Sequence, residues 1–270
     1  MVERTATIAT GADTDVAIVR RRGGSAANVA VAAARLGCEV RFFGRVGTDA
    51  IGAALISELE ASGVVAIVQR QGRTGTILVL VDPDGERSML RARGAAGELD
   101  ALEPPGLDGV SWLHVPAYSL VDGPAATVAR DALMQARGAG IVTSVDASST
   151  TVIDDLTPKG FAAMIGELRP SVVFANGTEA QLLPPPESWV GFEGTAVIKD
   201  GPRPARVIGV DGEPIAEAAA FDLGSVADTT GAGDAFAAGF IVAQLENRTP
   251  AAALRAGHAA AADHLRMSAG

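Results

Sequence analysis

The segment DTTGAGDAFAAGF, residues 228–240, places glycines and acids directly ahead of a small, apolar helical pattern. Apolar residues recur from Phe236 at i, i+4 and i+7, so we expect a helix that begins near Gly231. Glycines allow the free N–H groups of a helix start to converge, and the helix dipole makes that point favourable for an anion. Asp234 falls in the same first turn. Transfer of a phosphoryl group to a hydroxyl needs amides for the moving charge and a base for the proton, and this segment offers both.

Other chemistries find no support in the motifs. An isolated acid in a first turn often only stabilises the helix end, and that alternative stays open. A Walker A loop needs a lysine after its second glycine, and neither Lys159 nor Lys199 is so placed. The chain has no G-x-G-x-x-G, H-E-x-x-H, C-x-x-C or G-x-S-x-G motif. Its three histidines, His114, His258 and His264, are too scattered along the sequence to predict a metal site.

Composition narrows the class of protein. The chain has 270 residues and is 48% hydrophobic but only 4% aromatic, so its core must be aliphatic. A net charge of −10 argues against nucleic acid or an anionic membrane as partner. The single Cys38 excludes an intrachain disulfide, and no apolar run approaches the length of a membrane span. We therefore expect a soluble, cytoplasmic protein of one domain covering residues 1–270.

Hydrophobic periodicity predicts an α/β fold. From about residue 108, short β-branched runs (VSWLHV, IVTSVDA, SVVFAN and TAVIKDG) are mostly separated by helical stretches, which indicates a parallel sheet with helices on its faces. Residues 206–218 are typical of a hairpin, and two helices close the chain at 231–246 and 251–267. Nearer the N-terminus, helices are expected from an N-capping Ser25 to Gly37 and at 48–63. The β-like runs at about 4–20 and 64–92, with a turn at 82–85, are interpreted as an inserted appendage.

Several motifs together resemble one family, the ribokinase-like (PfkB-type) carbohydrate kinases. DTTGAGDAFAAGF is similar to the C-terminal signature of that family, and GGSAANVAVAAARLG followed by GRVGTDAIG is similar to its N-terminal signature. ANGTEAQLL resembles its N-x-x-E element, and DPDGERSM resembles a strand pair of its lid. The order and spacing of these elements match over nearly the whole chain.

The resemblance implies a three-layer α/β sandwich with a central, mostly parallel sheet and a small β-sheet lid over the sugar. It also implies roles for the segment analysed first. Asp234 would be the general base, and the amides around Gly231, Ala232 and Gly233 would form the anion hole.

By the same resemblance, Gly23, Gly24 and Asn28 would bind the hydroxylated substrate. The two glycines let a ligand approach the backbone, and Asn28 offers a donor and an acceptor to sugar hydroxyls. An ordinary capped helix packed through its alanines is the alternative, and it explains the glycine pair poorly.

The remaining implied residues concern ATP and cations. Asn176 and Glu179 would act on Mg²⁺ through water, although alone they indicate only a helix start. Gly201 belongs to a nucleotide-binding turn in which this chain has KDG where many members have T-x-G. His258 stands where an Asn near the adenine is common. Asp228 resembles a position that helps to hold a monovalent cation such as K⁺, and turn capping is an equally good explanation.

The chain departs from the family at its start. Members usually open with an apolar strand that carries a substrate-binding Asp, whereas residues 1–19 here already resemble the lid. Asp13 and Asp15 lie too close to Gly23 to replace that acid. We therefore expect the sheet to lack its first core strand, beside the strand at 39–44 or that at 110–115. We also expect ATP to bind and the sugar to be held weakly.

These observations predict ATP-dependent phosphorylation of a hydroxyl, preferably a primary one, on a small sugar or sugar acid. A nucleoside kinase is the nearest alternative, and a ligand-binding relative with impaired catalysis is another. The expected partners are the sugar and ATP, with no nucleic acid and no membrane. A homodimer through the β-lid is also expected.

Overall fold

The computed structural model describes residues 2–3, 11, 13, 15–81, 87–224, 226 and 228–268. Its centre is a six-stranded sheet in the order β12-β11-β10-β9-β8-β7. Four strands are parallel: β7 (Trp112–Pro116), β8 (Val142–Asp146), β9 (Val172–Asn176) and β10 (Thr195–Lys199). The other two, β11 (Ala205–Ile208) and β12 (Pro214–Ala218), form the antiparallel hairpin expected at 206–218. The alternating pattern therefore predicted the sheet correctly.

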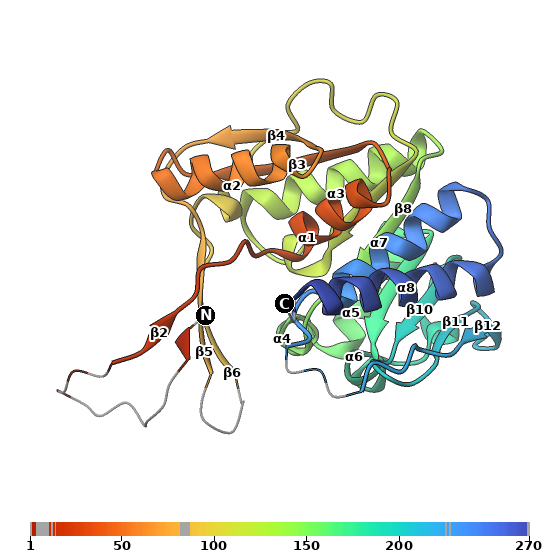
Figure 1. Ribbon diagram of the computed structural model, residues 1–270. Helices are drawn as coiled ribbons and strands as arrows, with labels where there is room; N and C mark the ends of the chain where they lie inside the picture. Colours follow the sequence, from red (N-terminus) through yellow and green to blue (C-terminus); the bar gives the residue numbers. More distant parts are fainter. Residues whose placement is uncertain are drawn as a thin grey trace.

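Helices cover both faces of this sheet, as Figure 1 shows. One layer consists of α1 (Ser25–Arg35), α7 (Ala232–Leu245) and α8 (Pro250–Ser268). The other consists of α3 (Gly123–Gly138), α4 (Thr150–Leu156), α5 (Pro158–Leu168) and α6 (Gly177–Leu182). Short 3-10 turns, η1 (Gly94–Glu98), η2 (Ala117–Ser119) and η3 (Pro186–Ser188), join elements at the rim. Two separate apolar cores result, one on each face of the sheet.

Helices α7 and α8 pack very closely. A Cβ placed on Gly239 would lie 2.5 Å from the carbonyl oxygen of Ala256, and one on Gly257 would lie 2.9 Å from the ring of Phe236. Small residues on both helices therefore set the distance between them. This contact fixes α7, whose first turn carries the GAGD residues.

The appendage is smaller than the sequence indicated. Strand β4 (Val64–Arg70) pairs in parallel with β3 (Val40–Val46), and α2 (Ala50–Ala61) connects them and packs on β4. The expected lid segment at 64–92 was therefore wrong in its first part, because β4 belongs to a β-α-β unit. The lid sheet has the order β2-β1-β5-β6, formed by Ala17–Ile18, Val2–Glu3, Thr76–Val81 and Arg87–Ala92. It stands away from the body in Figure 1, and the turn expected at 82–85 lies outside the described residues.

The β3–β4 pair and the six-stranded sheet do not join. Within the described ranges, no strand lies between β3 and β7, so each has one side without a strand partner. Helix α1 packs against both, and the Arg41 side chain donates a hydrogen bond of 2.5 Å to the carbonyl of Asp108 near the start of β7. This break falls where the sequence led us to expect a strand to be absent. None of the helices in the described part of the chain has the length and apolarity needed to cross a membrane.

Candidate active site

Three parallel strands end together in polar residues. Strand β8 ends at Asp146, β9 at Asn176 and β10 at Lys199. In open α/β sheets, ligands bind beyond the carboxyl ends of the strands. Helix α7 begins above this edge, because a Cβ on Gly233 would lie only 3.6 Å from the Lys199 Nζ. The structure therefore brings the GAGD turn to the edge of the sheet where ligands are expected.

The turn before α7 requires glycine. Gly231 is the N-cap of α7 and has a φ of 83°, a left-handed conformation that suits glycine. A Cβ there would also lie 2.9 Å from Nε2 of His264 on α8. That nitrogen donates a hydrogen bond of 2.8 Å to the carbonyl of Thr230. His264, which the sequence did not single out, therefore anchors the start of the expected anion hole from the neighbouring helix.

The Asp234 carboxylate is held by two donors from α1. Ser25 Oγ donates to Oδ1 at 2.7 Å, and Asn28 Nδ2 donates to Oδ2 at 2.8 Å. Burial raises the pKa of Asp234, while these two hydrogen bonds lower it, and the net shift is upward. Ser25 was expected to cap its own helix. Instead Gly24 is the N-cap, with no side-chain bond, and Ser25 reaches across to α7.

The amide of Asn28 is fixed from its other side. Arg22 Nη1 donates to Asn28 Oδ1 at 2.7 Å, and Arg22 Nε donates to Glu58 at 3.1 Å. The amide oxygen therefore faces the guanidinium, and its NH₂ group faces Asp234. A Cβ on Gly23 would meet nothing within 4 Å, so packing does not explain this glycine. The structure leaves open space beside the backbone where the sequence led us to expect substrate.

A buried ion pair lies beneath the first turn of α7. The Lys199 ammonium pairs with Asp146 Oδ2, and their side chains are 12% and 3% exposed. The same ammonium lies 5.7 Å from the centre of the Phe174 ring. Burial lowers the pKa of Lys199, but the charge and hydrogen bond of Asp146, with the charges of Glu179 and Asp234, raise it overall. Lys199 is therefore a charged ammonium beside the general-base candidate.

Asn176 and Glu179 form a complete capping box at the start of α6. Asn176 Oδ1 accepts from the Glu179 N–H at 2.9 Å, and Glu179 Oε2 accepts from the Asn176 N–H at 2.8 Å. The helix-start role is thus present in the structure, and a role toward Mg²⁺ would be additional to it. Burial raises the pKa of Glu179. The ranges that the structure describes hold no group of three or more His, Cys, Asp or Glu that could bind a metal on its own.

The other nucleotide and cation candidates have distinct surroundings. Gly201 follows β10 with a φ of 59° and open space around it. His258 is buried, with its Nε2 3.1 Å from the Ala218 carbonyl oxygen and its ring edge-on to Phe236. Asp228 accepts from the Thr230 N–H at 2.9 Å and from Arg21 at 2.8 Å. The turn-capping explanation of Asp228 is therefore present in the structure.

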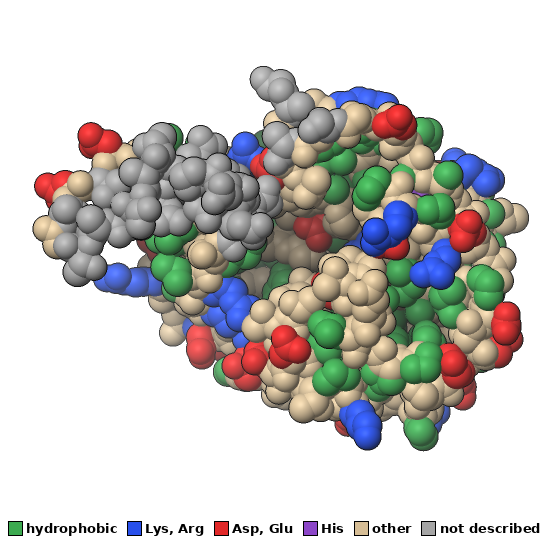
Figure 2. Space-filling model, turned by 90° about the horizontal axis from the view of Figure 1, so that it is seen from below, with side chains coloured by type: hydrophobic (Ala, Val, Ile, Leu, Met, Phe, Trp, Pro, Cys, Tyr) green, Lys and Arg blue, Asp and Glu red, His purple; other side chains and the backbone are tan. Residues whose placement is uncertain are grey.

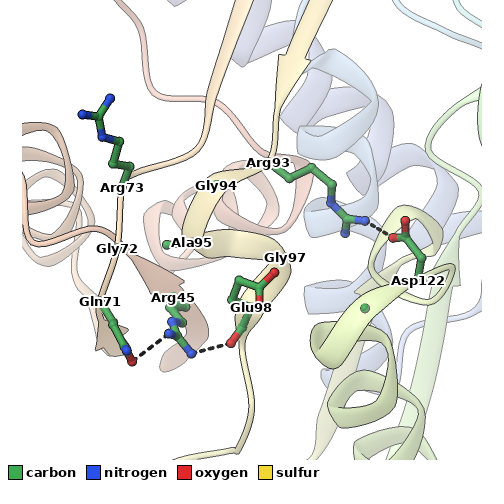
Figure 3. A pocket seen from close by; sticks show the side chains of 11 residues that line it. Arg45, Gln71, Gly72, Arg73, Arg93, Gly94, Ala95, Gly97, Glu98 and Asp122 are labelled. Atoms are coloured by element: carbon green, nitrogen blue, oxygen red, sulfur yellow. Dashed lines mark hydrogen bonds and ion pairs between the residues drawn. The ribbon is translucent and has the colours of Figure 1, made fainter.

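A cavity of about 500 Å³ opens at the foot of the lid, between the ends of β3, β4 and β6 and the start of α3. Figure 3 shows Arg45 bonded to Gln71 at 2.7 Å and Arg93 paired with Asp122. Arg93 also donates to the Tyr118 carbonyl at 3.0 Å. Arg93 is one of the lid and pocket residues that the sequence suggested for sugar contact, whereas the expected catalytic, nucleotide and metal residues do not line this cavity.

Tyr118 connects that cavity with the Asp234 site. The backbone of Ala26 and Ser25 at the start of α1 lies near enough to lower the pKa of its phenol, an effect that burial outweighs. Burial raises the pKa of Tyr118 to about 12, so the phenol stays protonated.

On the face turned toward the viewer in Figure 2, the surface is hollowed next to the part drawn in grey, and an acidic side chain is visible inside.

The fold and this site define a ribokinase-like sugar or nucleoside kinase. The chain belongs to the pfkB family of carbohydrate kinases, whose model matches residues 8–265. It is 37% identical over 234 residues to the ATP-dependent ribose-1-phosphate kinase of Halopiger xanaduensis, covering 83% of this chain and 73% of that protein. It is 35% identical over 139 residues to the fructokinase of Vibrio alginolyticus, covering 50% of this chain and 45% of that protein.

Solved structures agree with this assignment. The adenosine kinase of Sinorhizobium meliloti superposes with a TM-score of 0.78 at 27% identity, covering 93% of this chain and 78% of that one. A putative ribokinase II from E. coli gives a TM-score of 0.79 at 21% identity, covering 97% and 88%, and supports the fold alone.

Proposed function

We propose that this chain transfers the γ-phosphoryl group of ATP to a hydroxyl, preferably a primary one, of a small sugar or sugar derivative. The observation that carries the proposal is the Asp234 carboxylate, held by Ser25 and Asn28 at the glycine-rich start of α7. A base and a set of free amides at one point are what phosphoryl transfer to a hydroxyl requires.

In this proposal, Asp234 accepts the proton of the attacking hydroxyl. Its upward-shifted pKa makes it a stronger base than an ordinary aspartate. The Asn28 side chain, which Arg22 orients, hydrogen-bonds the sugar that receives the phosphoryl group. The Ala232 N–H already donates to the Thr229 carbonyl at 3.2 Å, so the amide of Gly233 is the one that would face the phosphoryl oxygens and stabilise their charge. Gly23 and Gly24 leave room for the acceptor against α1.

The residues fit Mg²⁺ held largely by water and phosphate. Mg²⁺ keeps several waters and commonly uses one or two carboxylates together with substrate phosphates. Glu179 and Asn176, at the end of β9, would contact those waters, and the bound ion would neutralise charge on the triphosphate. Gly201 would border the nucleotide, and Asp228 stays a candidate for a monovalent cation. His258 has no part here, because it lies in the interior.

We propose that the end of the sugar farthest from its reacting hydroxyl lies in the cavity near Arg93. Arg93 holds Tyr118, which touches the same turn of α1 that supplies Ser25. Arginines suit a phosphate or carboxylate substituent. A phosphorylated sugar is thus a reasonable acceptor, in keeping with the ribose-1-phosphate kinase that the chain resembles. Arg93→Met should lower kcat/KM for ribose 1-phosphate by a larger factor than that for free ribose.

The decisive experiment is an assay of ADP release and phosphorylated product with a panel of acceptors. The panel contains ribose, ribose 1-phosphate, fructose, 2-keto-3-deoxygluconate and adenosine. Asp234→Asn should lower kcat by about 10² or more while ATP still binds. Adenosine as the best acceptor would instead establish the nucleoside kinase. ATP binding without product from any acceptor would favour the ligand-binding alternative.

The lid supports the expected homodimer. Ile18, Met89 and Leu90 are 73%, 57% and 59% exposed on its strands. Exposed apolar sheets of this kind usually have a partner, and a second lid is the partner we propose. Met89→Glu should then shift the mass measured by light scattering from dimer to monomer. A monomeric wild-type protein would refute this part of the proposal.

A further inference from the structure

The first observation concerns where the Lys199 ammonium lies. It sits at the carboxyl end of β10, and its distance from a Cβ at Gly233 would be 3.6 Å. A Cβ at that position would project from the first turn of α7, beside the amide that we assign to the anion hole. The ammonium is therefore next to the space where α7 would bind an anion, although it comes from a strand.

The second observation concerns how the ammonium is held. Asp146 accepts from it on one side, and the Phe174 ring lies on another at 5.7 Å. Phe174 lies on the neighbouring strand β9 and Asp146 on the next strand, β8, and the Asp146 side chain is 3% exposed. A lysine held by a buried carboxylate and an aromatic face loses little further freedom when it binds a ligand.

The third observation concerns the surrounding charge. The carboxylates of Asp146, Glu179 and Asp234 all act electrostatically on Lys199. These three carboxylates share one ammonium, and that ammonium is also the positive group next to the first turn of α7. Burial of an ion pair is also weak evidence for a purely stabilising role, because desolvation offsets much of the attraction.

From these observations we infer that Lys199 is a phosphate-binding residue, which contacts the transferring phosphoryl group together with the α7 amides, and that Asp146 positions it. This inference rests on the proposed function for the identity of the ligand. A lysine is a compact point charge with three donors, so it can bond Asp146 and a phosphoryl oxygen at once. Its contribution grows as charge develops on that oxygen, which is the condition for stabilising a transition state.

The test removes the charge and keeps the volume, with Lys199→Met. We expect kcat to fall by about 10² to 10³, as when one donor of an oxyanion site is lost, and the Kd for ADP to change little. Arg248→Met is the matched control, because Arg248 forms an exposed ion pair with Glu246 at the opposite end of α7. It should keep wild-type turnover.

A second variant separates phosphate binding from structural support. Lys199→Met leaves the buried Asp146 unpaired and should lower Tm, whereas Asp146→Asn combined with Lys199→Met should restore much of that loss. Under our inference, the double variant regains stability but not turnover. Recovery of turnover together with Tm would show that Lys199 acts only by supporting the fold, and would overturn the inference.

A third readout does not depend on catalysis. Inorganic phosphate should raise the Tm of the wild-type protein and of Arg248→Met, and should have no such effect on the double variant. If the wild-type protein has no kinase activity but shows this phosphate effect, the proposed function fails and the phosphate site stands. An equal effect of phosphate on wild type and double variant would refute the site.

Discussion

His114 should make the stability of this protein fall as the pH drops below about 6.5. The residue lies on the edge strand β7, where Ser144 Oγ is 2.8 Å from its Nδ1 and also accepts from Trp112 at 2.8 Å. The serine hydroxyl has one proton and two lone pairs, so it can bond Nδ1 in either neutral tautomer of the ring. In the protonated ring Nε2 would also carry an N–H, and this atom is buried with no hydrogen-bond partner among the described residues. The site therefore accommodates the neutral ring and not the cation.

The expected magnitude follows from the pKa. Burial lowers the pKa of His114 from 6.5 to about 4, and the nearby charges of Asp146 and Lys199 act in opposite directions. Between these two values the unfolded chain binds a proton that the folded chain does not, so stability decreases as the pH falls. At about 1.4 kcal/mol per pH unit, the loss is at most about 3 kcal/mol. It is an upper limit because His114 as a whole residue is only half-buried, although its Nε2 atom is buried.

The measurement compares wild type with His114→Gln in denaturant-unfolding curves from pH 8 to pH 4.5. The difference between their unfolding free energies should be constant above pH 7. At the acid end it should move in favour of the variant by about 1 to 3 kcal/mol, as the pKa difference implies. NMR titration of the histidine rings reports His114 directly. Parallel curves, or a His114 ring that titrates near 6.5, would refute this reasoning.

Three further predictions come from packing, from hydrogen bonding and from the unpaired strand edges. Gly239→Ala should destabilise the protein by about 1–3 kcal/mol in the same unfolding assay, because its Cβ would overlap the Ala256 carbonyl. Gly138→Ala adds a Cβ with no atom within 4 Å, so it should leave the stability unchanged or raise it. Equal losses of stability in the two variants would contradict the packing argument. Ser25→Ala removes a hydrogen-bond donor that favours the charged form of Asp234. The acid limb of the kcat/KM profile against pH should therefore move to higher pH, and an unmoved limb would disprove that contact. In hydrogen exchange, alternate amides of β3 and β7 should exchange fast, since each strand is paired on one side only; uniform protection would contradict the unpaired edges.

Much of the fold was predictable because its signals are local. Each parallel strand is a short β-branched run, and a helix of ordinary length separates most of them, so the order of elements fixes the layered architecture. The start of α7 was also predictable from the sequence, because Gly231 adopts the left-handed conformation that a glycine there suggests. Asn176 and Glu179 form the capping box that their spacing indicates.

The errors and omissions arise where contacts are distant in sequence. β4 was assigned to the lid because its run is β-like, and its pairing with β3 carries no local signal. Ser25 meets Asp234 across 209 residues, and Lys199 meets Asp146 across 53. A serine at a helix start and a lysine at a strand end each have an ordinary local explanation. Only the arrangement of the sheet and of α1 against α7 shows what they contact.

The charges at the carboxyl edge of the sheet set a condition on any triphosphate that binds there. Asp146, Glu179 and Asp234 converge on this edge, in a protein whose net charge is −10. A phosphate oxygen about 4 Å from one uncompensated carboxylate would be repelled by about 4 kcal/mol at the effective dielectric of a protein surface. Lys199 offsets one carboxylate, and the dipole of α7 supplies only about half a positive charge. We expect a divalent cation that arrives with the nucleotide to neutralise the remaining excess. Metal-free ATP should therefore bind at least tenfold more weakly than Mg²⁺–ATP in calorimetry, since a tenfold ratio needs only about 1.4 kcal/mol of this repulsion. Equal affinities would mean that the triphosphate does not approach these three carboxylates.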